Sequence, residues 1–550
     1  TKVDHCRDVI PIMNRSPVYK WYLVVPKCLF FFLAVLTILI HHAEAFEHEE
    51  SSINFQDYSR DVIKQNRDKN KPYFLLFAAQ WCHWCDLFIE ETLSKEKVYT
   101  YLRNNFTNIF IDADIHSSAY RKYKATGVPF TVFLNPDGSP YYKYAGALYA
   151  KEFLEVIQDV HKNISENRSV DGEENYQIEY EPPTELKTAD LEKIREMYQQ
   201  GILDNFDLKE YGLGTGEKSI LHQTFLYLLD SLRGQDRKDA IRWISKTLEK
   251  AVENIYDSVE GGFFRYAEKK DWDIPHYEKM ADLNAGAVKV LYEINKQSPS
   301  PYLKKAADKT VQYLTSTLYD SNIGSFLSFQ EADTSYYFLN KKNRKHNQRP
   351  NVVEKVFTDR LAKTLFYLID VLEFNTNYEL QEKVKKSLDF MAKMILKNEE
   401  IYHYYSISER QWLSNGSLPD YANSAILFFK AAKKFQNKSY NEVAMKILRL
   451  SKESFFDAEK MIFFDPTMDS LDDVEYLMEM NGLFAQMMLD MEIIEEKKDD
   501  LRYKSEPMIT YFSAMDEMLE EQIWDAENWK FAERYVPYMR ALDKYLASRE

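Results

Sequence analysis

Cysteine is scarce in this 550-residue chain, which contains only Cys6, Cys28, Cys82 and Cys85. So few cysteines in a chain of this length exclude a fold held together by a network of disulfides. A bridge between Cys82 and Cys85 would close so short a loop that it would add little stability through chain entropy. We therefore interpret this pair as a reactive site and not as a disulfide that stabilises the fold.

Positive charge is also in short supply: the formal net charge is −16, and no basic tract interrupts the acidic excess. A nucleic-acid binder needs a surplus of lysine and arginine on some face to neutralise phosphates, so this composition argues against a nucleic-acid partner. Hydrophobic residues make up 45% of the chain, which is typical of globular proteins, and 550 residues exceed what one core usually holds. We therefore expect two or more folded domains.

The N-terminal segment lacks an apolar run long enough to cross a bilayer as a helix. The uninterrupted apolar stretch Cys28–Ile40 contains 13 residues, whereas a spanning helix needs about 20. Lys20 and Lys27 precede the stretch and the small-x-small sequence Ala43–Ala45 follows it, which is the pattern of a signal peptide. We predict a signal peptide over residues 1–45, with an uncleaved membrane anchor as the alternative. Either one exports the chain to a periplasm or a secretory lumen and confines membrane contact to this leader.

Residues 46–160 alternate strand and helix signals. Buried-strand patterns occupy Tyr73–Ala78, Asn108–Asp112 and Phe130–Leu134, and helical spacing covers Asp86–Val98. A tight turn after the third strand leads into a fourth, and a helical segment closes the region. This order of strand, helix, strand, hairpin and helix predicts a small α/β domain.

A polar, acidic linker over residues 161–183 separates this domain from a region of different character. Residues 184–550 contain long amphipathic segments with apolar residues at helical spacing, and no convincing alternating strand. Six helical hairpins would fill the region, so we predict an all-α closed (α/α)6 toroid, with an open α-solenoid as the alternative. Aromatic turns recur about every 60 to 80 residues, and they begin at Gly261, Gly324, Tyr402 and Met461.

The segment Trp81–Cys85 carries a clear chemical signal. It reads Trp-Cys-His-Trp-Cys, follows a predicted buried strand and opens a predicted helix. The unpaired amides and the dipole at a helix N-terminus favour a thiolate, so we expect Cys82 to have a lowered pKa and to act as a nucleophile. Cys85, one turn further on, is placed to attack the resulting mixed disulfide and release the partner. His83 either adds positive charge that favours the thiolate or faces solvent as a spectator.

A structural zinc ion is the competing use of such a cysteine pair. Zinc takes four ligands, usually from two Cys-x-x-Cys units or from cysteines and histidines at suitable spacing. The chain has no second pair. We therefore expect no metal and no cofactor at this motif.

The downstream segment Gly127–Phe130 completes a likeness to a known fold. Together with Trp81–Cys85, in which Trp81 and Trp84 flank the cysteines, it resembles the thioredoxin superfamily. The resemblance implies that Pro129 is cis and that the backbone of Val128 binds a substrate strand. One departure concerns Leu76, which stands where thioredoxins carry a buried acid, so the proton relay of that acid has no counterpart here.

Two further stretches, Gly261–Tyr266 and Asp271–Met280, extend the resemblance beyond the first domain. With the redox motif they resemble the two-domain family of the spermatogenesis-associated thioredoxin-like protein and its bacterial relatives. That family implies a thioredoxin-like domain followed by a six-hairpin toroid similar to sugar epimerases and glycosidases. Here Asp86 follows the second cysteine, where the family commonly has histidine, and the chain is shorter than typical members.

A candidate cleft in the toroid combines acidic, basic and aromatic side chains on predicted loops. A histidine and a carboxylate there would suit the acid-base chemistry of an epimerase or a glycosidase. The same residues would equally cap a helix and anchor loops. They are Trp272, Asp273, His276, Glu278 and Asp420.

Three functions remain open from the sequence. The first is an extracytoplasmic thiol-disulfide oxidoreductase that acts on a protein dithiol or disulfide client, with the toroid binding the client or a glycan. The second, from another class, is a carbohydrate-active toroid with an accessory redox domain. The third is a binding scaffold in which the bridge between Cys82 and Cys85 is permanent.

Overall fold

The computed structural model describes residues 53–59, 61–63, 71–166, 168, 188–458, 462–465, 474–494 and 532–548. The predicted leader, residues 1–45, and residues 167 and 169–183 of the predicted linker lie outside this range. Ser51–Glu550 form one compact unit. Within the described ranges, no helix combines the length and the apolar character that a membrane crossing needs.

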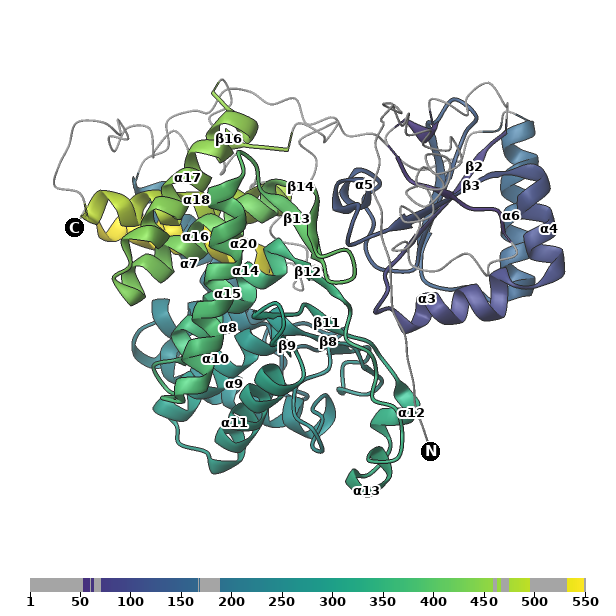
Figure 1. Cartoon of the computed structure of the whole chain (residues 1–550). Coiled ribbons are helices and arrows are strands. Elements are labelled where there is room, and N and C mark those ends of the chain that lie inside the picture. The colour runs from purple at the N-terminus through teal and green to yellow at the C-terminus, as the bar shows by residue number, and fades with distance from the viewer. Residues whose placement is uncertain are drawn as a thin grey trace, which may run out of the picture. The chain divides into compact units, whose positions relative to one another are not determined.

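The first domain is built on a five-stranded mixed sheet with the order β1-β3-β2-β4-β5 (Figure 1). Strands β1 and β2 run parallel to β3, whereas β4 runs antiparallel to both β2 and β5. The three central strands are buried at every residue, as expected where helices cover both faces of a sheet. The strands are β1 Gln56–Asp57, β2 Tyr73–Ala78, β3 Thr107–Asp112, β4 Phe130–Leu134 and β5 Pro140–Ala145.

The helices of this domain begin and end at slightly different residues from those predicted. The predicted helix Asp86–Val98 is divided: α3 starts at His83, a π-helical segment continues it to Leu93, and α4 starts at Glu96. Helix α6 extends to Ser165, so the first residues of the predicted linker 161–183 are helical. The elements are α3 His83–Leu87, η2 Phe88–Leu93, α4 Glu96–Asn105, α5 Ser117–Lys122 and α6 Ala150–Ser165.

The second domain is a closed ring of helices. Each of six inner helices packs against the next, and α20 packs against α8, which closes the circle. The predicted (α/α)6 toroid is therefore confirmed, and the open solenoid is wrong. The inner helices are α8 His222–Ser231, α10 Ala281–Gln297, α14 Thr358–Val371, α16 Leu418–Phe435, α18 Val474–Ile494 and α20 Ala532–Ala547.

Outer helices surround this ring and pair with inner ones. Their buried residues recur at helical spacing on one face, as in α15, whereas the inner helices α10 and α16 are buried around most of their surface. This difference follows from position, because an inner helix has neighbours on every side. The outer helices are α7 Thr188–Asp204, α9 Gly234–Asn254, α11 Pro301–Ser316, α15 Tyr378–Lys397 and α17 Lys438–Phe455, and two short helices, α12 Thr334–Tyr337 and α13 Lys341–Arg344, lie in a connection.

The helical domain also contains strands, which corrects the prediction that it has none. The clearest are β12 Lys355–Phe357, β13 Tyr402–Ser406 and β14 Gln411–Asn415, which form a three-stranded antiparallel sheet. The others are two residues long, too short for alternation to be visible in the sequence. They pair as β6 Tyr266–Ala267 with β7 Pro275–His276, β8 Lys279–Met280 with β11 Phe329–Gln330, β9 Tyr319–Asp320 with β10 Ser325–Phe326, and β15 Phe456–Asp457 with β16 Ile462–Phe463.

Inner-helix asparagines hold two of the aromatic turns. Asn284 of α10 accepts a hydrogen bond from the backbone N–H of Phe263 and donates one to its carbonyl oxygen. Asn481 of α18 does the same for Phe463. The recurrence of the aromatic turns in the sequence therefore reflects a repeated way of fastening a hairpin to the ring.

Candidate redox site and adjoining cavity

The two cysteines of the redox motif lie where strand β2 passes into helix α3. Cys82 is the N-cap residue of α3, and a disulfide joins it to Cys85. The carbonyl oxygen of Cys82 accepts hydrogen bonds from the N–H groups of Cys85 and Asp86, which fixes the first turn around the bridge. Both cysteines are buried, with 4% and 1% of their surfaces exposed.

The loop before strand β4 faces this disulfide. The peptide bond between Val128 and Pro129 is cis, as the thioredoxin resemblance implies. The Val128 carbonyl oxygen lies 3.5 Å from the Sγ atom of Cys82. The structure thus brings together the cysteines, Val128 and Pro129 as predicted, whereas the Trp84 side chain is 45% exposed.

Trp81 joins the redox motif to the toroid. Its indole Nε1–H donates a 2.7 Å hydrogen bond to the carboxylate of Asp114, just beyond strand β3. Its ring lies 4.7 Å from the guanidinium of Arg265 and 6.0 Å from the ring of Phe329, both residues of the toroid. Burial, reinforced by the neighbouring Asp112 carboxylate, raises the pKa of Asp114 to about 6.

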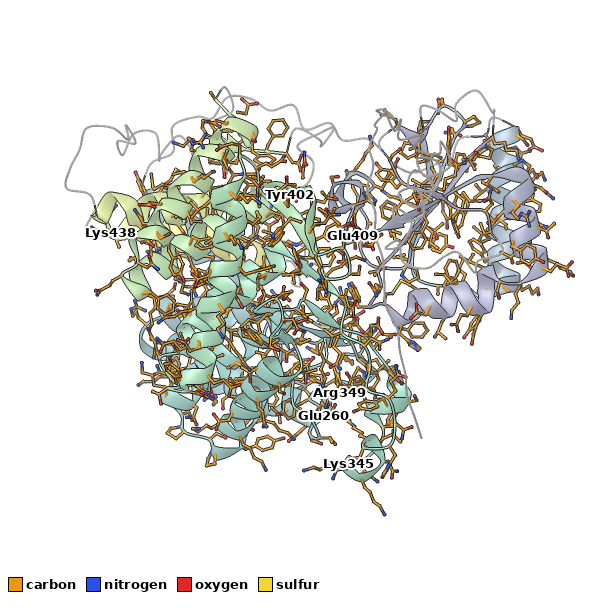
Figure 2. All side chains as sticks on the ribbon, in the orientation of Figure 1. Glu260, Lys345, Arg349, Tyr402, Glu409 and Lys438 are labelled. Carbon is orange, nitrogen blue, oxygen red and sulfur yellow. A yellow bond between two sulfur atoms is a disulfide. The ribbon has the colours of Figure 1, made fainter. Side chains whose placement is uncertain are left out.

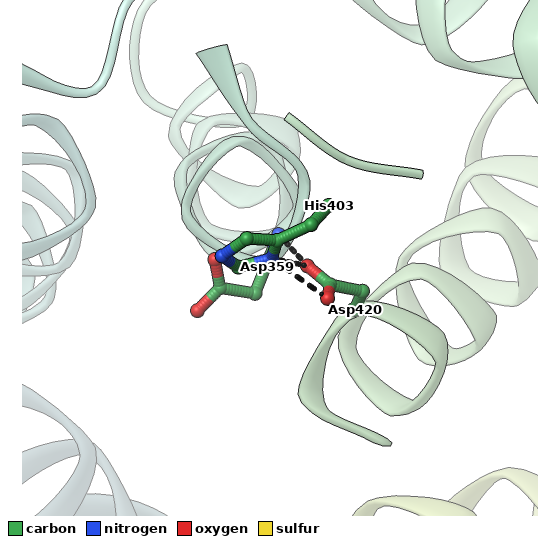
Figure 3. Close-up of side chains that lie close together, drawn as sticks. All are labelled: Asp359, His403 and Asp420. Carbon is green, nitrogen blue, oxygen red and sulfur yellow. Dashed lines mark hydrogen bonds and ion pairs between the residues drawn. The ribbon is translucent and has the colours of Figure 1, made fainter. Parts of the chain in front are cut away.

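A second contact between the domains centres on His403, which Figure 3 shows beside Asp359 and Asp420. Its Nε2 donates to the backbone carbonyl oxygen of Asp114 at 2.7 Å, and its Nδ1 donates to Asp420 at 2.9 Å. Burial by itself lowers the pKa of His403, but the Asp420 carboxylate outweighs it and raises the pKa to about 9. The ring is therefore an imidazolium that donates from both nitrogens.

The same histidine lies in the cluster Asp359, His403 and Asp420, whose ligand-type atoms fall within 4.8 Å of one another. A metal ligand must offer a lone pair, and both ring nitrogens of His403 are already donating. Asp420 also accepts from the backbone N–H groups of Asp359 and Ser417. The cluster is thus a buried ion pair that completes a helix cap, and its residues do not suit a cation.

A cavity of about 690 Å³ lies between the redox motif and the toroid. Trp81 and Val128 line it on one side, and the N-terminal ends of the six inner helices line it on the other. Each inner helix contributes at least one polar side chain, and these include His222, Asp282, Arg360, Asn423, Glu479 and Glu533.

The polar side chains of the cavity form ion pairs across neighbouring helices. Arg360 pairs with Asp282 at 3.0 Å and Lys363 with Glu479 at 2.8 Å. The Lys363 ammonium overcomes the effect of burial and lowers the pKa of Glu479. The cavity therefore presents both signs of charge.

One further pair in the cavity combines an imidazole and a carboxylate. The Nδ1 atom of His222 lies 3.2 Å from Glu533, and burial raises the pKa of that carboxyl group. The ring of His222 packs against Tyr367 and against Gly286, where any Cβ atom would overlap the imidazole. Packing therefore fixes the orientation of this histidine.

A larger cavity, of about 1240 Å³, lies at the opposite end of the ring, where the inner helices have their C-terminal halves. Several of its lysines pair with acids, for example Lys430 with Asp370 at 2.7 Å. Apolar residues that line both cavities, such as Phe366, Ile426 and Leu483, lie between them. Only the smaller cavity is lined by residues of the redox domain among those that the structure describes.

Three residues of the predicted toroid cleft have structural contacts instead of a place in the cavity. The Trp272 side chain is fully buried, and its indole Nε1–H donates to the backbone carbonyl oxygens of Glu210 and Tyr211. Asp273 lies on the surface within 3.7 Å of Lys269. His276 stacks on the ring of Tyr266.

The other two predicted cleft residues act on the cavity through neighbours. Glu278 is buried and pairs with Arg265 at 3.3 Å, the arginine that lies over Trp81. Asp420 holds His403, as described above. Sequence reasoning missed both partners, although Arg265 directly follows the distinctive Gly-Gly-Phe-Phe turn and His403 stands within an aromatic turn.

The loop near Gly261 is held by a buried network of charged side chains. The Lys279 ammonium donates to Asp257 and to the carbonyl oxygen of Gly261, each at 2.8 Å. Arg344 binds both oxygens of Asp257, and an outer pair between Glu260 and Arg349, labelled in Figure 2, extends the network to the surface. These residues fasten a loop and have no access to the cavity.

Comparison with known proteins follows this division into two domains. Residues 41–179 match the family Thioredox_DsbH, described as "Protein of unknown function, DUF255". An uncharacterized protein of Caenorhabditis elegans is 24% identical over 314 residues, which cover 52% of this chain and 42% of that protein. Human spermatogenesis-associated protein 20 is 23% identical over 324 residues, which cover 54% of this chain and 41% of that protein. The matched part thus spans about two fifths of each relative's length.

The toroid has its own structural likeness. The crystal structure of D-mannose isomerase aligns over 67% of this chain and 100% of its own, with a TM-score of 0.50 and 10% sequence identity. At so low an identity, the likeness establishes the fold of the helical domain alone. The chain is therefore a thioredoxin-like domain followed by an (α/α)6 toroid.

Proposed function

We propose that this chain is an extracytoplasmic thiol-disulfide oxidoreductase in which Cys82 is the nucleophile and Cys85 is the resolving thiol. The observation that carries the proposal is the disulfide between these residues at the first turn of α3, opposite the backbone of Val128. A cysteine at such a helix start is favoured as a thiolate, and a second thiol one turn away can displace an adduct.

The reaction proceeds in two exchanges. The thiolate of Cys82 attacks one sulfur of a substrate disulfide, forms a mixed disulfide and releases the other substrate sulfur as a thiolate. The thiolate of Cys85 then attacks the Sγ atom of Cys82 and releases the remaining substrate thiolate. Two electrons pass to the substrate, the protein is left with the disulfide that the structure contains, and the reverse sequence oxidises a substrate dithiol.

Trapping the intermediate tests this proposal. In a Cys85→Ser variant the second exchange is impossible, so a mixed disulfide on Cys82 should accumulate when the reduced protein meets a substrate disulfide. Mass spectrometry of the non-reduced protein would show the adduct at Cys82. The matched Cys82→Ser variant should give at least tenfold less adduct, and equal labelling of both variants would contradict the assigned roles.

A second candidate function is acid-base chemistry on a carbohydrate in the cavity. His222 beside Glu533 favours it, because a buried imidazole and a carboxyl group with a raised pKa are suited to moving protons. A sugar is also the substrate class in the name of D-mannose isomerase, whose fold the toroid shares.

A thermal-shift screen of monosaccharides and disaccharides addresses this second function. A ligand that binds the cavity should raise the melting temperature of the unaltered protein and lose its effect in a His222→Gln variant. His276→Gln is the matched control, because His276 lies outside the cavity. If no sugar stabilises the protein, or if both variants respond alike, the carbohydrate function fails.

A further inference from the structure

The toroid covers the face of the redox domain that would meet a protein client. Trp81, which directly precedes the nucleophile, is only 7% exposed because Arg265 and Phe329 of the toroid pack on its ring. His403 binds the carbonyl oxygen of Asp114 on the adjoining loop. An extended peptide that docked beside Val128 would have to displace these contacts, so a folded protein has poor access to Cys82.

The cavity, in contrast, reaches both residues that flank the nucleophilic sulfur. Trp81 and Val128 line it, and the Val128 carbonyl oxygen is 3.5 Å from the Sγ atom of Cys82. Its volume of about 690 Å³ falls within the range of roughly 300 to 1,000 Å³ that is typical of small-molecule sites. A compound of a few amino acids in size fits this space.

The charges of the cavity indicate what such a compound carries. Arg265 pairs with Glu278, and Arg360 pairs with Asp282 and Asp359, yet the two arginine side chains remain 35% and 39% exposed. A guanidinium group has five donors in a fork that matches a carboxylate, so each arginine can bind a further one. Glu533 and Asp359 in the same cavity can accept from an ammonium group.

We infer that the substrate of the redox pair is a low-molecular-weight thiol or disulfide that carries both carboxylate and ammonium groups, and that Arg265 binds its carboxylate. This inference rests on the proposed function, since it assigns a substrate class to the same two cysteines. The electron balance is that given above: the reduced pair converts one small disulfide to two thiols and becomes oxidised. A dithiol such as dithiothreitol restores the reduced pair between turnovers.

Single-turnover kinetics with four disulfides test the inference. The full chain is reduced with dithiothreitol, desalted and mixed with glutathione disulfide, bis(2-hydroxyethyl) disulfide, cystamine or insulin, and oxidation is followed by tryptophan fluorescence. Each rate constant is divided by that of free dithiothreitol with the same disulfide, which removes differences in intrinsic reactivity. Glutathione disulfide should then react at least tenfold faster than the neutral and cationic compounds, and insulin slowest of all.

Variants and a competitor assign the preference to the cavity. Arg265→Gln should reduce the preference for glutathione disulfide over the neutral disulfide to threefold or less, whereas the exposed Arg449→Gln should leave this preference unchanged. S-methylglutathione, which has no disulfide, should slow the reaction of the unaltered protein with the neutral disulfide. This competition keeps the test informative if the Arg265 variant fails to fold.

The possible failures are distinguishable. Equal normalised rates for all small disulfides, or insulin as the fastest substrate, would overturn the inference and leave the redox function standing. Slow reaction with all four disulfides, together with slow alkylation of Cys82, would overturn the proposed function itself.

Discussion

The Nε2 atom of His403 donates a hydrogen bond to the carbonyl oxygen of Asp114 at 2.7 Å, across 289 residues of sequence. Asp114 also accepts a hydrogen bond from the indole of Trp81, which directly precedes Cys82. A single histidine of the toroid therefore fixes the loop that supports the redox motif. This link joins the toroid to the redox domain beside the cysteine pair.

Replacing His403 should remove a pH-dependent part of the protein's stability. The pKa of His403 is raised, so its contribution is complete below the unfolded value of about 6.5 and is lost as the pH rises through about 9. The carboxylates of Asp359 and Asp420 favour the charged form of the His403 ring. Burial lowers the pKa of nearby His116, so His116 does not contribute to the change between about pH 6.5 and 9. We expect His403→Gln to lower the free energy of unfolding at pH 6.5 by about 1.5 to 3 kcal/mol.

Thermal melts from pH 6 to 9.5 check this expectation. The melting temperature of the unaltered protein should fall towards that of His403→Gln as the pH approaches 9.5. His346→Gln, at an exposed position, should follow the unaltered protein throughout. Parallel curves for the unaltered protein and the His403 variant would show that the histidine does not hold the loop as a cation.

Asp86, which follows the second cysteine, should destabilise the protein at neutral pH. Burial, together with the Glu331 and Glu90 carboxylates, raises the pKa of Asp86 to about 7. The ionised carboxylate therefore lowers the stability of the fold. This loss of stability is absent below the unfolded pKa of about 3.9 and complete above about 7. Asp86→Asn should raise the melting temperature at pH 8 and leave it unchanged at pH 4, while the exposed Glu91→Gln should shift it little at either pH. A gain of equal size at both pH values would argue against this explanation.

The two tryptophans of the motif should differ sharply in their contribution to stability. Trp81→Phe removes the donor to a buried carboxylate and should cost about 1 to 3 kcal/mol in urea unfolding. Trp84→Phe alters a 45% exposed ring and should change the free energy of unfolding by less than about 0.5 kcal/mol. Similar costs for both variants would contradict the link between Trp81 and Asp114.

Gly286 of α10 should be intolerant of a side chain. An added Cβ atom would overlap the imidazole of His222, so Gly286→Ala should cost about 1 to 3 kcal/mol through overpacking. Gly216→Ala meets no atom within 4 Å and serves as the control. Differential scanning calorimetry should show a clearly lower melting temperature for the first variant alone, and an unaltered melting temperature would mean that His222 can move aside.

Local patterns in the sequence predicted the features that depend on neighbouring residues. The cysteine pair at a strand-to-helix junction follows from hydrophobic spacing within a few residues of it, and the cis bond at Pro129 follows from a resemblance carried by a short segment. Helical periodicity likewise predicted the ring. Strands such as β8 and β11 escaped notice because two residues show no alternation.

Contacts between distant parts of the chain could not be predicted in this way. Nothing near Asp114 in the sequence indicates His403, and nothing near Trp81 indicates Arg265. Trp272 was predicted to lie in the toroid cleft, yet its side chain is fully buried and its indole donates to backbone carbonyl oxygens. Such outcomes depend on how the two domains and their loops pack, which no local pattern records.

Alkylation of the reduced protein tests the central claim most directly. In a Cys85→Ser variant at pH 7, iodoacetamide should modify Cys82 at least tenfold faster than it modifies free cysteine, because the start of a helix favours the thiolate. Peptide mapping of samples quenched over time gives the rate at that residue. A rate equal to that of free cysteine, or slower, would contradict the assignment of Cys82 as the nucleophile.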